Sequence, residues 1–190
     1  NWLCARQPAS VSTDMLTSLG LVGAAMVLAG YVASQGDLRW LWIAIAGYFL
    51  HWFGDSLDGS LARYRRIERP RFGYFIDHSA DGIGNLMIVG GLGLSPFVRL
   101  DVALLALAGY YLLSIHAFLT AKVIGELRLS YAAAGPTELR LLLIGMTLVM
   151  LYAQPTAPVI FDLTVLDVVV ASIATILIAL FVVHTFAIAR

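Results

Sequence analysis

Gly54-Asp55-Ser56-Leu57-Asp58-Gly59-Ser60-Leu61-Ala62-Arg63 is the first half of a polar segment that interrupts a strongly apolar chain. The second half follows a basic bridge and reads Phe72-Gly73-Tyr74-Phe75-Ile76-Asp77-His78-Ser79-Ala80-Asp81-Gly82. Together the two halves hold four of the chain's 12 Asp and Glu residues. Ionisable groups are costly at membrane depth, so a cluster of them indicates a functional site.

The composition around this segment is that of a membrane protein. Of the 190 residues, 60% are hydrophobic, and the mean hydropathy is +0.86, well above that of an ordinary soluble chain. The formal net charge is zero, which gives no support for nucleic-acid binding. The single cysteine, Cys4, excludes an intramolecular disulfide and a cysteine-based metal site. The sequence therefore predicts an all-α integral membrane protein.

Apolar runs of about 20 residues, the length needed to cross a bilayer core of about 30 Å, recur along the chain. We expect a short interfacial segment over residues 1–12, followed by one domain of six transmembrane helices over residues 13–190. The first helix is expected to be capped by Thr13 or Asp14. The six expected helices cover 15–32, 38–63, 72–93, 97–123, 136–152 and, from Asp162 or Thr164, up to 188.

Basic residues are distributed unequally between the two sides of such a bundle. Only Arg39 and Arg99 fall on one side. The other side holds both termini and the remaining basic residues: Arg6, Arg63, Arg65, Arg66, Arg69, Arg71, Lys122, Arg128, Arg140 and Arg190. By the positive-inside rule, the termini and the polar segment are expected to face the cytoplasm.

The polar segment places its aspartates on one stripe of each of two neighbouring helices, at about 100° per residue. The first stripe consists of Asp55, Asp58, Gly59, Ala62 and Arg63, and the second of Gly73, Asp77 and Asp81. Antiparallel helices joined by a short loop can bring four carboxylates together, and these like charges then need compensation. Carboxylate oxygens suit hard cations such as Mg²⁺ or Mn²⁺, so the pattern predicts a metal site for phosphoryl chemistry.

Other residues of the stripes suit an anionic ligand. Gly59 and Ala62 would let a ligand lie against the helix backbone, and Arg63 offers a planar fork for phosphate. Gly73 stands where the N-terminus of the next helix attracts anions. In the alternative interpretation, the aspartates are surface charges or partners of the loop arginines. Those arginines fit topology determinants or anionic-lipid contacts better than catalytic groups: Arg65, Arg66, Arg69 and Arg71.

The spacing Asp55-x-x-Asp58-Gly59-x-x-Ala62-Arg63, then nine residues, then Gly73-x-x-x-Asp77-x-x-x-Asp81 resembles the signature of the CDP-alcohol phosphotransferase (CDP-alcohol phosphatidyltransferase) family. The resemblance implies a homodimeric membrane enzyme of phospholipid synthesis, in which an acceptor hydroxyl displaces CMP from a CDP-alcohol. It implies that the four aspartates bind two divalent ions, Mg²⁺ or Mn²⁺, and that Gly59, Ala62, Arg63 and Gly73 hold the CDP moiety. Asp81 is the position usually assigned as the base.

Two details resemble one branch of the family, the choline and ethanolamine phosphotransferases. They are Asp77-His78 and Gly135-Pro136-Thr137-Glu138. In that branch, the histidine beside the third aspartate is a candidate base for a diacylglycerol hydroxyl, a role that suits a near-neutral pKa. The alternatives are a His78 satisfied by a neighbour, and a Glu138 that caps its helix instead of orienting the histidine or binding the acceptor.

The substrate order stays open between two schemes. The chain is shorter than the eukaryotic members of that branch, which favours CDP-diacylglycerol with a small alcohol, in a prokaryotic cell membrane. His78 and Glu138 favour a CDP-headgroup with diacylglycerol. His51, one turn before Asp55, either supports the aspartates or packs between helices. Three basic residues could bind an acceptor phosphate, as in relatives that use inositol phosphate: Lys122, Arg128 and Arg140. Alternatives from other classes are a cation transporter or channel and a catalytically silent scaffold.

Overall fold

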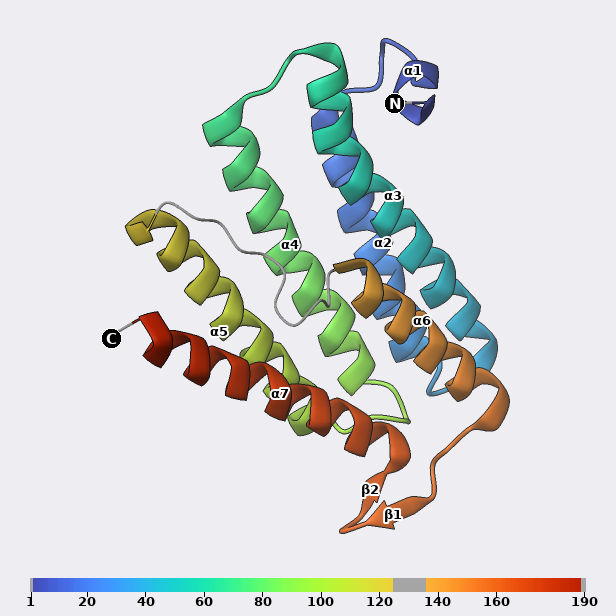
Figure 1. The fold of residues 1–190 in the computed structure, drawn as a ribbon. Helices are drawn as coiled ribbons and strands as arrows, with labels where there is room; N and C mark the ends of the chain where they lie inside the picture. Colours follow the sequence, from blue (N-terminus) through green and yellow to red (C-terminus); the bar gives the residue numbers. More distant parts are fainter. Residues whose placement is uncertain (1, 125–135, 189–190) are drawn as a thin grey trace. The chain divides into compact units, whose positions relative to one another are not determined.

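Helices make up nearly all of residues 2–124 and 136–188, the part of the chain that the computed structural model describes (Figure 1). The helices are α1 (Trp2–Arg6), α2 (Thr13–Ala33), the 3-10 turn η1 (Leu38–Trp40), α3 (Leu41–Arg65), α4 (Pro70–Gly93), α5 (Leu100–Ile124), α6 (Pro136–Ala153) and α7 (Val165–Ile188). The prediction of an all-α protein is therefore confirmed in its main part. Arg128, Gly135 and Arg190 lie outside the described residues.

One short β hairpin departs from the all-α prediction. β1 (Pro158–Ile160) pairs antiparallel with β2 (Leu163–Thr164) between α6 and α7. Phe161 and Asp162 make the turn with φ of 45° and 60°. Positive φ at both central residues matches the twist of paired strands, but the sequence lacks the Asn-Gly or Asp-Gly signal that usually marks such a turn.

Three helices are long and apolar enough to cross a membrane: α2, α5 over Leu100–Val123, and α7. The length and composition of these helices support an integral membrane protein. The other three expected spans, α3, α4 and α6, are helical as predicted but fall outside this group. α3 carries two motif aspartates with Arg63 and Arg65, and α4 carries two with Arg71; these charged residues lower the mean hydropathy of both helices. The prediction of six spans is therefore not confirmed: among the described residues, three helices have the length and composition of a span.

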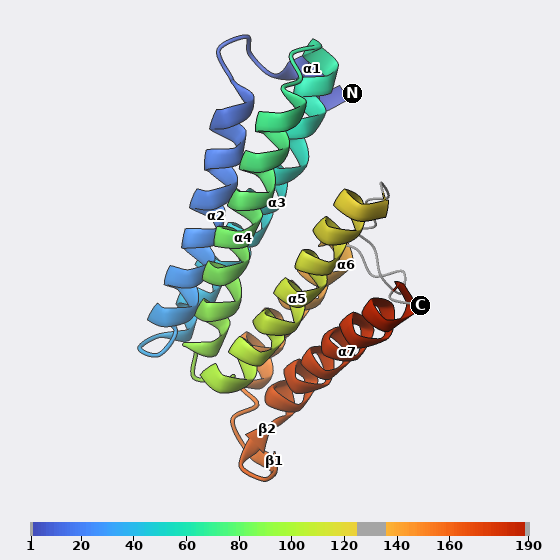
Figure 2. The same cartoon turned by 90° about the vertical axis from the view of Figure 1, so that its left-hand side faces the viewer.

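The chain divides into two compact units, Asn1–Gly91 and Leu92–Arg190. The first contains α2, α3 and nearly all of α4, which run side by side (Figures 1 and 2). In the second, α5 and α7 pack along each other. The single domain expected over residues 13–190 stays a prediction.

Two helix starts differ from the prediction. The cap of α2 is Ser12, whose hydroxyl accepts a hydrogen bond from the Met15 N–H at 3.1 Å, where the sequence predicts Thr13 or Asp14. α4 begins at Pro70, two residues before the predicted start at residue 72. Proline suits that position because the first helical N–H has no partner within the helix.

α2 and α3 pack backbone to backbone through small residues. Those on α2 are Gly20, Gly23 and Gly30, and those on α3 are Ala44, Gly47 and Gly54. A Cβ atom on Gly54 would lie only 2.5 Å from the backbone nitrogen of Gly20 and from the carbonyl oxygen of Leu16. Small residues permit such close approach of membrane helices. The approach brings the N-terminal half of α2 against the first half of the motif.

The N-terminal segment is fastened to the end of α3 by arginines. The guanidinium of Arg65 donates to the backbone carbonyls of Pro8 at 2.8 Å and Val11 at 2.5 Å. Arg69 forms an ion pair with Asp14 at the start of α2. Topology or lipid binding is therefore not the whole role of these two loop arginines. The interfacial position of residues 1–12 stays a prediction.

In the second unit, Asp167 joins the start of α7 to the turn before α5. Asp167 is 1% exposed, and it forms a capping box with Thr164: each backbone N–H donates to the other's side chain, at 2.9 and 3.1 Å. The other carboxylate oxygen of Asp167 accepts from the Arg99 N–H at 2.7 Å. One buried carboxylate thus satisfies donors from two segments that are far apart in sequence.

Replacing Asp167 by alanine should destabilise this unit strongly. Two backbone donors would lose a charged acceptor, and a loss of this kind costs about 2–4 kcal/mol. Thermal unfolding of the detergent-solubilised protein measures the change. Asp101→Ala is the matched control, because Asp101 makes an exposed ion pair with Arg99, and such pairs contribute little. Equal unfolding temperatures for the two variants would contradict the role given to Asp167.

Candidate active site

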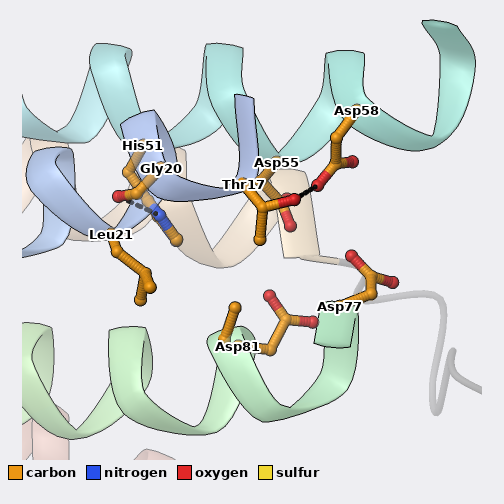
Figure 3. A pocket seen from close by; sticks show the side chains of 9 residues that line it. Thr17, Gly20, Leu21, His51, Asp55, Asp58, Asp77 and Asp81 are labelled. Atoms are coloured by element: carbon orange, nitrogen blue, oxygen red, sulfur yellow. Dashed lines mark hydrogen bonds between the residues drawn. The ribbon is translucent and has the colours of Figure 1, made fainter. Parts of the chain in front are cut away.

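All four aspartates of the motif line one pocket of the first unit (Figure 3). Asp55 and Asp58 come from α3, and Asp77 and Asp81 face them from α4. The helical spacing of each pair explains why both side chains of a pair reach the same space. The pocket is completed by Thr17, Gly20, Leu21, His51 and Ala80. The structure therefore brings together the residues predicted as metal ligands, while their role as ligands stays a prediction.

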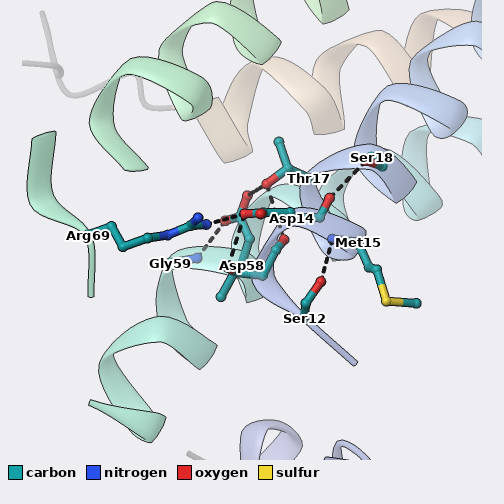
Figure 4. Close-up of polar contacts among 9 residues, drawn as sticks. Ser12, Asp14, Met15, Thr17, Ser18, Asp58, Gly59 and Arg69 are labelled. Carbon is teal, nitrogen blue, oxygen red and sulfur yellow. Dashed lines mark hydrogen bonds and ion pairs between the residues drawn. The ribbon is translucent and has the colours of Figure 1, made fainter. Parts of the chain in front are cut away.

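The carboxylates of the pocket differ in how far they are buried. Asp58 is 7% exposed, whereas the side chain of Asp77 is 44% exposed. Asp58 Oδ2 accepts a hydrogen bond from the Thr17 hydroxyl at 2.7 Å, and Oδ1 accepts from the Gly59 N–H at 2.6 Å (Figure 4). A buried charge needs such partners to offset its lost hydration. Asp58 is thus buried and held by hydrogen bonds to both carboxylate oxygens.

The donor set of the pocket fits a hard divalent cation, since carboxylate oxygens from two helices face a common space. Over residues 2–124 and 136–188, no group of three or more His, Cys, Asp or Glu side chains is close enough to hold a metal ion in the arrangement seen. The residues fit a metal site in type and direction.

His51 stands behind the aspartates and touches three helices. It is 5% exposed on α3, and its Nδ1 lies 3.1 Å from the backbone carbonyl oxygen of Gly20 on α2. Because a carbonyl only accepts, Nδ1 is the donor in this bond. A Cβ on Gly84 of α4 would lie 3.3 Å from the imidazole ring. The geometry fits both interpretations of His51, as a packing residue and as a support for the pocket that it lines.

His78 does not line the pocket of the four aspartates. Its ring stacks on Tyr74 one turn earlier in α4, with ring centroids 4.1 Å apart and planes 28° from parallel. Its Nδ1 lies 3.4 Å from Asp77 Oδ2. His78 therefore lies beside Asp77 and outside the pocket lining, whereas Asp81, the other candidate base, lines the pocket.

The four residues expected to hold CDP also lie outside the lining of this pocket: Gly59, Ala62, Arg63 and Gly73. Arg63 is exposed and places its guanidinium 3.5 Å from the position that a Cβ on Gly59 would occupy. Gly73 faces open space. A guanidinium next to bare backbone, beside the aspartates in sequence, is an arrangement that suits phosphate groups.

The residues proposed for the acceptor belong to the second unit. Glu138 is exposed in the first turn of α6, where an acidic side chain interacts favourably with the helix dipole. Lys122 is exposed in the last turn of α5. Arg140 lies in α6, and Arg128 lies outside the described residues.

The α2 wall of the pocket, formed by Thr17, Gly20 and Leu21, is missed by the sequence reasoning. The motif lies entirely on α3 and α4, so it gives no information about a third helix. One signal was available. Gly20, Gly23 and Gly30 recur at helical spacing on α2, and Thr17 precedes Gly20 by three residues, so a polar side chain lies near a face suited to close helix packing.

Comparison with known proteins extends beyond the motif. The family model described as CDP-alcohol phosphatidyltransferase matches residues 11–187. The archaetidylinositol phosphate synthase of Pyrococcus horikoshii is 30% identical over 118 residues, which are 57% of this chain and 60% of that protein. The phosphatidylinositol phosphate synthase of Cutibacterium acnes is 35% identical over 86 residues, 45% of this chain and 39% of that protein. The chain thus spans less than two thirds of the length of either relative.

Proposed function

The chain belongs to the CDP-alcohol phosphatidyltransferase family, and from this premise we propose that it is a membrane transferase in which an acceptor hydroxyl displaces CMP from a CDP-alcohol. The family resemblance predicted from the motif is confirmed by the match over residues 11–187. The observation that carries the proposal is the pocket, in which Asp55 and Asp58 from α3 face Asp77 and Asp81 from α4.

CDP-diacylglycerol is the donor that we favour. Both relatives are named for lipid products that join a lipid phosphatidyl or archaetidyl group to an inositol phosphate. These names support a lipid donor and a small, phosphorylated polyol as acceptor. The placement of His78 outside the pocket gives no support to the rival scheme, in which a CDP-headgroup reacts with diacylglycerol.

Divalent metal is used by this family, and here the four aspartates would hold two ions, Mg²⁺ or Mn²⁺. When bound, such ions neutralise phosphate oxygens and the charge that develops during transfer. Around them, Gly59, Ala62, Arg63 and Gly73 would receive the diphosphate and cytidine of the donor; the guanidinium of Arg63 beside Gly59 supports this proposal. The tight hold on Asp58 limits the reorganisation that binding would require.

The reaction exchanges the phosphoanhydride bond of the CDP-alcohol for a phosphoester bond to the acceptor. The acceptor oxygen forms a bond to the phosphorus that carries the alcohol of the donor, while the bond from that phosphorus to CMP breaks. CMP leaves with the electron pair, and the proton of the acceptor hydroxyl passes to a base. Asp81 is the proposed base, because it lines the pocket and His78 does not.

The membrane arrangement is part of the same proposal. We infer that α2 to α7 provide six spans and that the motif end of α3 and α4 faces the cytoplasm, since ten of the 12 Lys and Arg residues fall on that side. A prokaryotic cell membrane is the proposed location. The resemblance also implies a homodimer, which sedimentation of the purified protein in detergent would test.

The proposed activity predicts metal-dependent release of CMP. Purified protein is incubated with CDP-diacylglycerol and a panel of alcohols that includes inositol phosphate, and separately with CDP-choline or CDP-ethanolamine and diacylglycerol. We expect CMP to be released from CDP-diacylglycerol with one of the alcohols. This release should stop when EDTA chelates the metal and resume when Mg²⁺ or Mn²⁺ is added.

The same assay separates the rival functions. A cation transporter or channel would carry ions across vesicles without any dependence on cytidine nucleotides. A silent scaffold would bind neither metal nor nucleotide in a manner sensitive to the aspartates. Absence of metal-dependent CMP from every donor and acceptor pair would count against the transferase.

A further inference from the structure

The pocket has a third wall, and one residue of that wall bonds directly to a predicted metal ligand. Thr17 lies on α2, outside the motif, and its hydroxyl donates to Asp58 Oδ2 at 2.7 Å. We propose that Thr17 is a positioning residue that fixes the Asp58 carboxylate for metal binding. The proposal rests on the function given above, and it extends the site from two helices to three.

The hydroxyl of Thr17 has two acceptors within reach but only one hydrogen to donate. One acceptor is the carbonyl oxygen of Thr13, one turn earlier in α2, at 3.3 Å. The other is Asp58 Oδ2, 0.6 Å nearer and charged. Charge-assisted bonds are shorter and stronger than neutral ones. The hydroxyl therefore serves the carboxylate across the helix interface in preference to its own helix.

Asp58 is the aspartate for which such a partner matters most. Of the four aspartates, Asp58 alone is buried, and the other three are partly exposed. The carboxylates of Asp55 and Asp77 line the same pocket, so Asp58 also has like charges nearby. Loss of the Thr17 bond would leave Asp58 Oδ2 desolvated and the carboxylate able to turn away from its neighbours. Each carboxylate oxygen accepts about two bonds, so Thr17 and Gly59 each leave one position for a ligand.

The position of Thr17 depends on the glycine contact between α2 and α3. Gly20 lies three residues after Thr17 and opposite Gly54, which lies four residues before Asp58. Because neither glycine has a side chain, α2 and α3 lie close enough for the short Thr17 side chain to reach Asp58. A longer separation of the helices would leave the hydroxyl and carboxylate too far apart to bond.

Thr17→Val tests the proposal, because valine keeps the branched shape and removes the hydroxyl, whereas Thr17→Ser keeps the hydroxyl. Mn²⁺ binding is titrated on the full chain in detergent without nucleotide, and thermal unfolding is followed on the same samples. Removal of a residue that orients a metal ligand typically weakens metal affinity by about 10–100-fold. We expect that loss for Thr17→Val and near wild-type affinity for Thr17→Ser.

Thr175→Val is the matched control. Thr175 is an exposed residue of α7 whose hydroxyl bonds only to the carbonyl of Ala171, at 2.8 Å, among the bonds that the described residues show. The same chemical change there should leave Mn²⁺ affinity unaltered. A comparable loss for Thr175→Val would mean that the assay reports general stability, and it would overturn the role of Thr17.

A double-mutant cycle with Asp58→Asn distinguishes positioning from bulk destabilisation. If Thr17 acts through Asp58, then Thr17→Val should change Mn²⁺ affinity little in the Asp58→Asn background. An equal loss in both backgrounds overturns the proposal, as does wild-type affinity in the single variant. Wild-type protein that binds no Mn²⁺ and releases no CMP overturns the proposed function itself. Should Thr17→Val not fold, Thr17→Ala completes the same cycle.

Discussion

Gly54→Val is expected to separate α2 from α3 and to abolish CMP release. The new Cβ would stand 2.5 Å from the backbone nitrogen of Gly20 and from the carbonyl oxygen of Leu16, closer than such atoms approach. Backbone atoms in a helix cannot turn aside as a flexible side chain does, so the whole helix must move. Overpacking typically costs about 1–3 kcal/mol, and this contact should lie at the upper end or beyond it.

The movement would also break the site. A shift of α2 removes the Thr17 hydroxyl from Asp58 and the Gly20 carbonyl from His51. Thermal unfolding and CMP release of the variant are compared with those of Gly90→Val, the same change on α4 at a position where a Cβ meets nothing within 4 Å. Wild-type behaviour of Gly54→Val would show that the two helices are not held together in this way.

Asp81→Asn is expected to lower the rate of CMP release by about 10²–10⁴-fold, the usual contribution of a positioned base. Asparagine keeps the shape of the side chain but takes up no proton, and it removes one carboxylate from the pocket. His78→Ala should retain most of the turnover, because the His78 ring stacks on Tyr74 outside the pocket lining. The two variants are compared by rapid-quench measurement of a single turnover.

Asp37→Asn controls for the chemical change in this comparison. Asp37 accepts a hydrogen bond from the Arg39 N–H at 2.8 Å at the start of η1, and asparagine serves that capping role equally well. If His78→Ala loses as much rate as Asp81→Asn, the histidine is the base and the assignment to Asp81 is wrong.

The grouping of the aspartates could be read from the sequence because it follows from local geometry. Asp55 and Asp58 share a face of any helix that contains them, and so do Asp77 and Asp81. The loop between the two helices is too short for any arrangement other than neighbours in antiparallel order. These two facts suffice to bring four carboxylates to one pocket, as the structure has them.

The contribution of α2 depends on tertiary contacts that no local rule gives. Glycines at helical spacing on α2 and α3 indicate close packing, but they do not say which two helices meet or in which register. The direction of the His78 ring likewise depends on the stacking partner that it finds in Tyr74. The sequence places His78 about 100° from Asp77, and only the structure shows what it contacts there.

The two arginines that hold the N-terminal segment differ in what they recognise. Arg69 pairs with a side chain, Asp14, so a change at position 14 is felt at once. Among the described residues, the partners of Arg65 are main-chain carbonyls, which every amino acid supplies. Substitutions among the intervening residues can therefore accumulate in evolution without loosening the segment, provided that its backbone keeps the same course. The attachment therefore requires the arginine at position 65 but no particular side chains at the positions that it contacts.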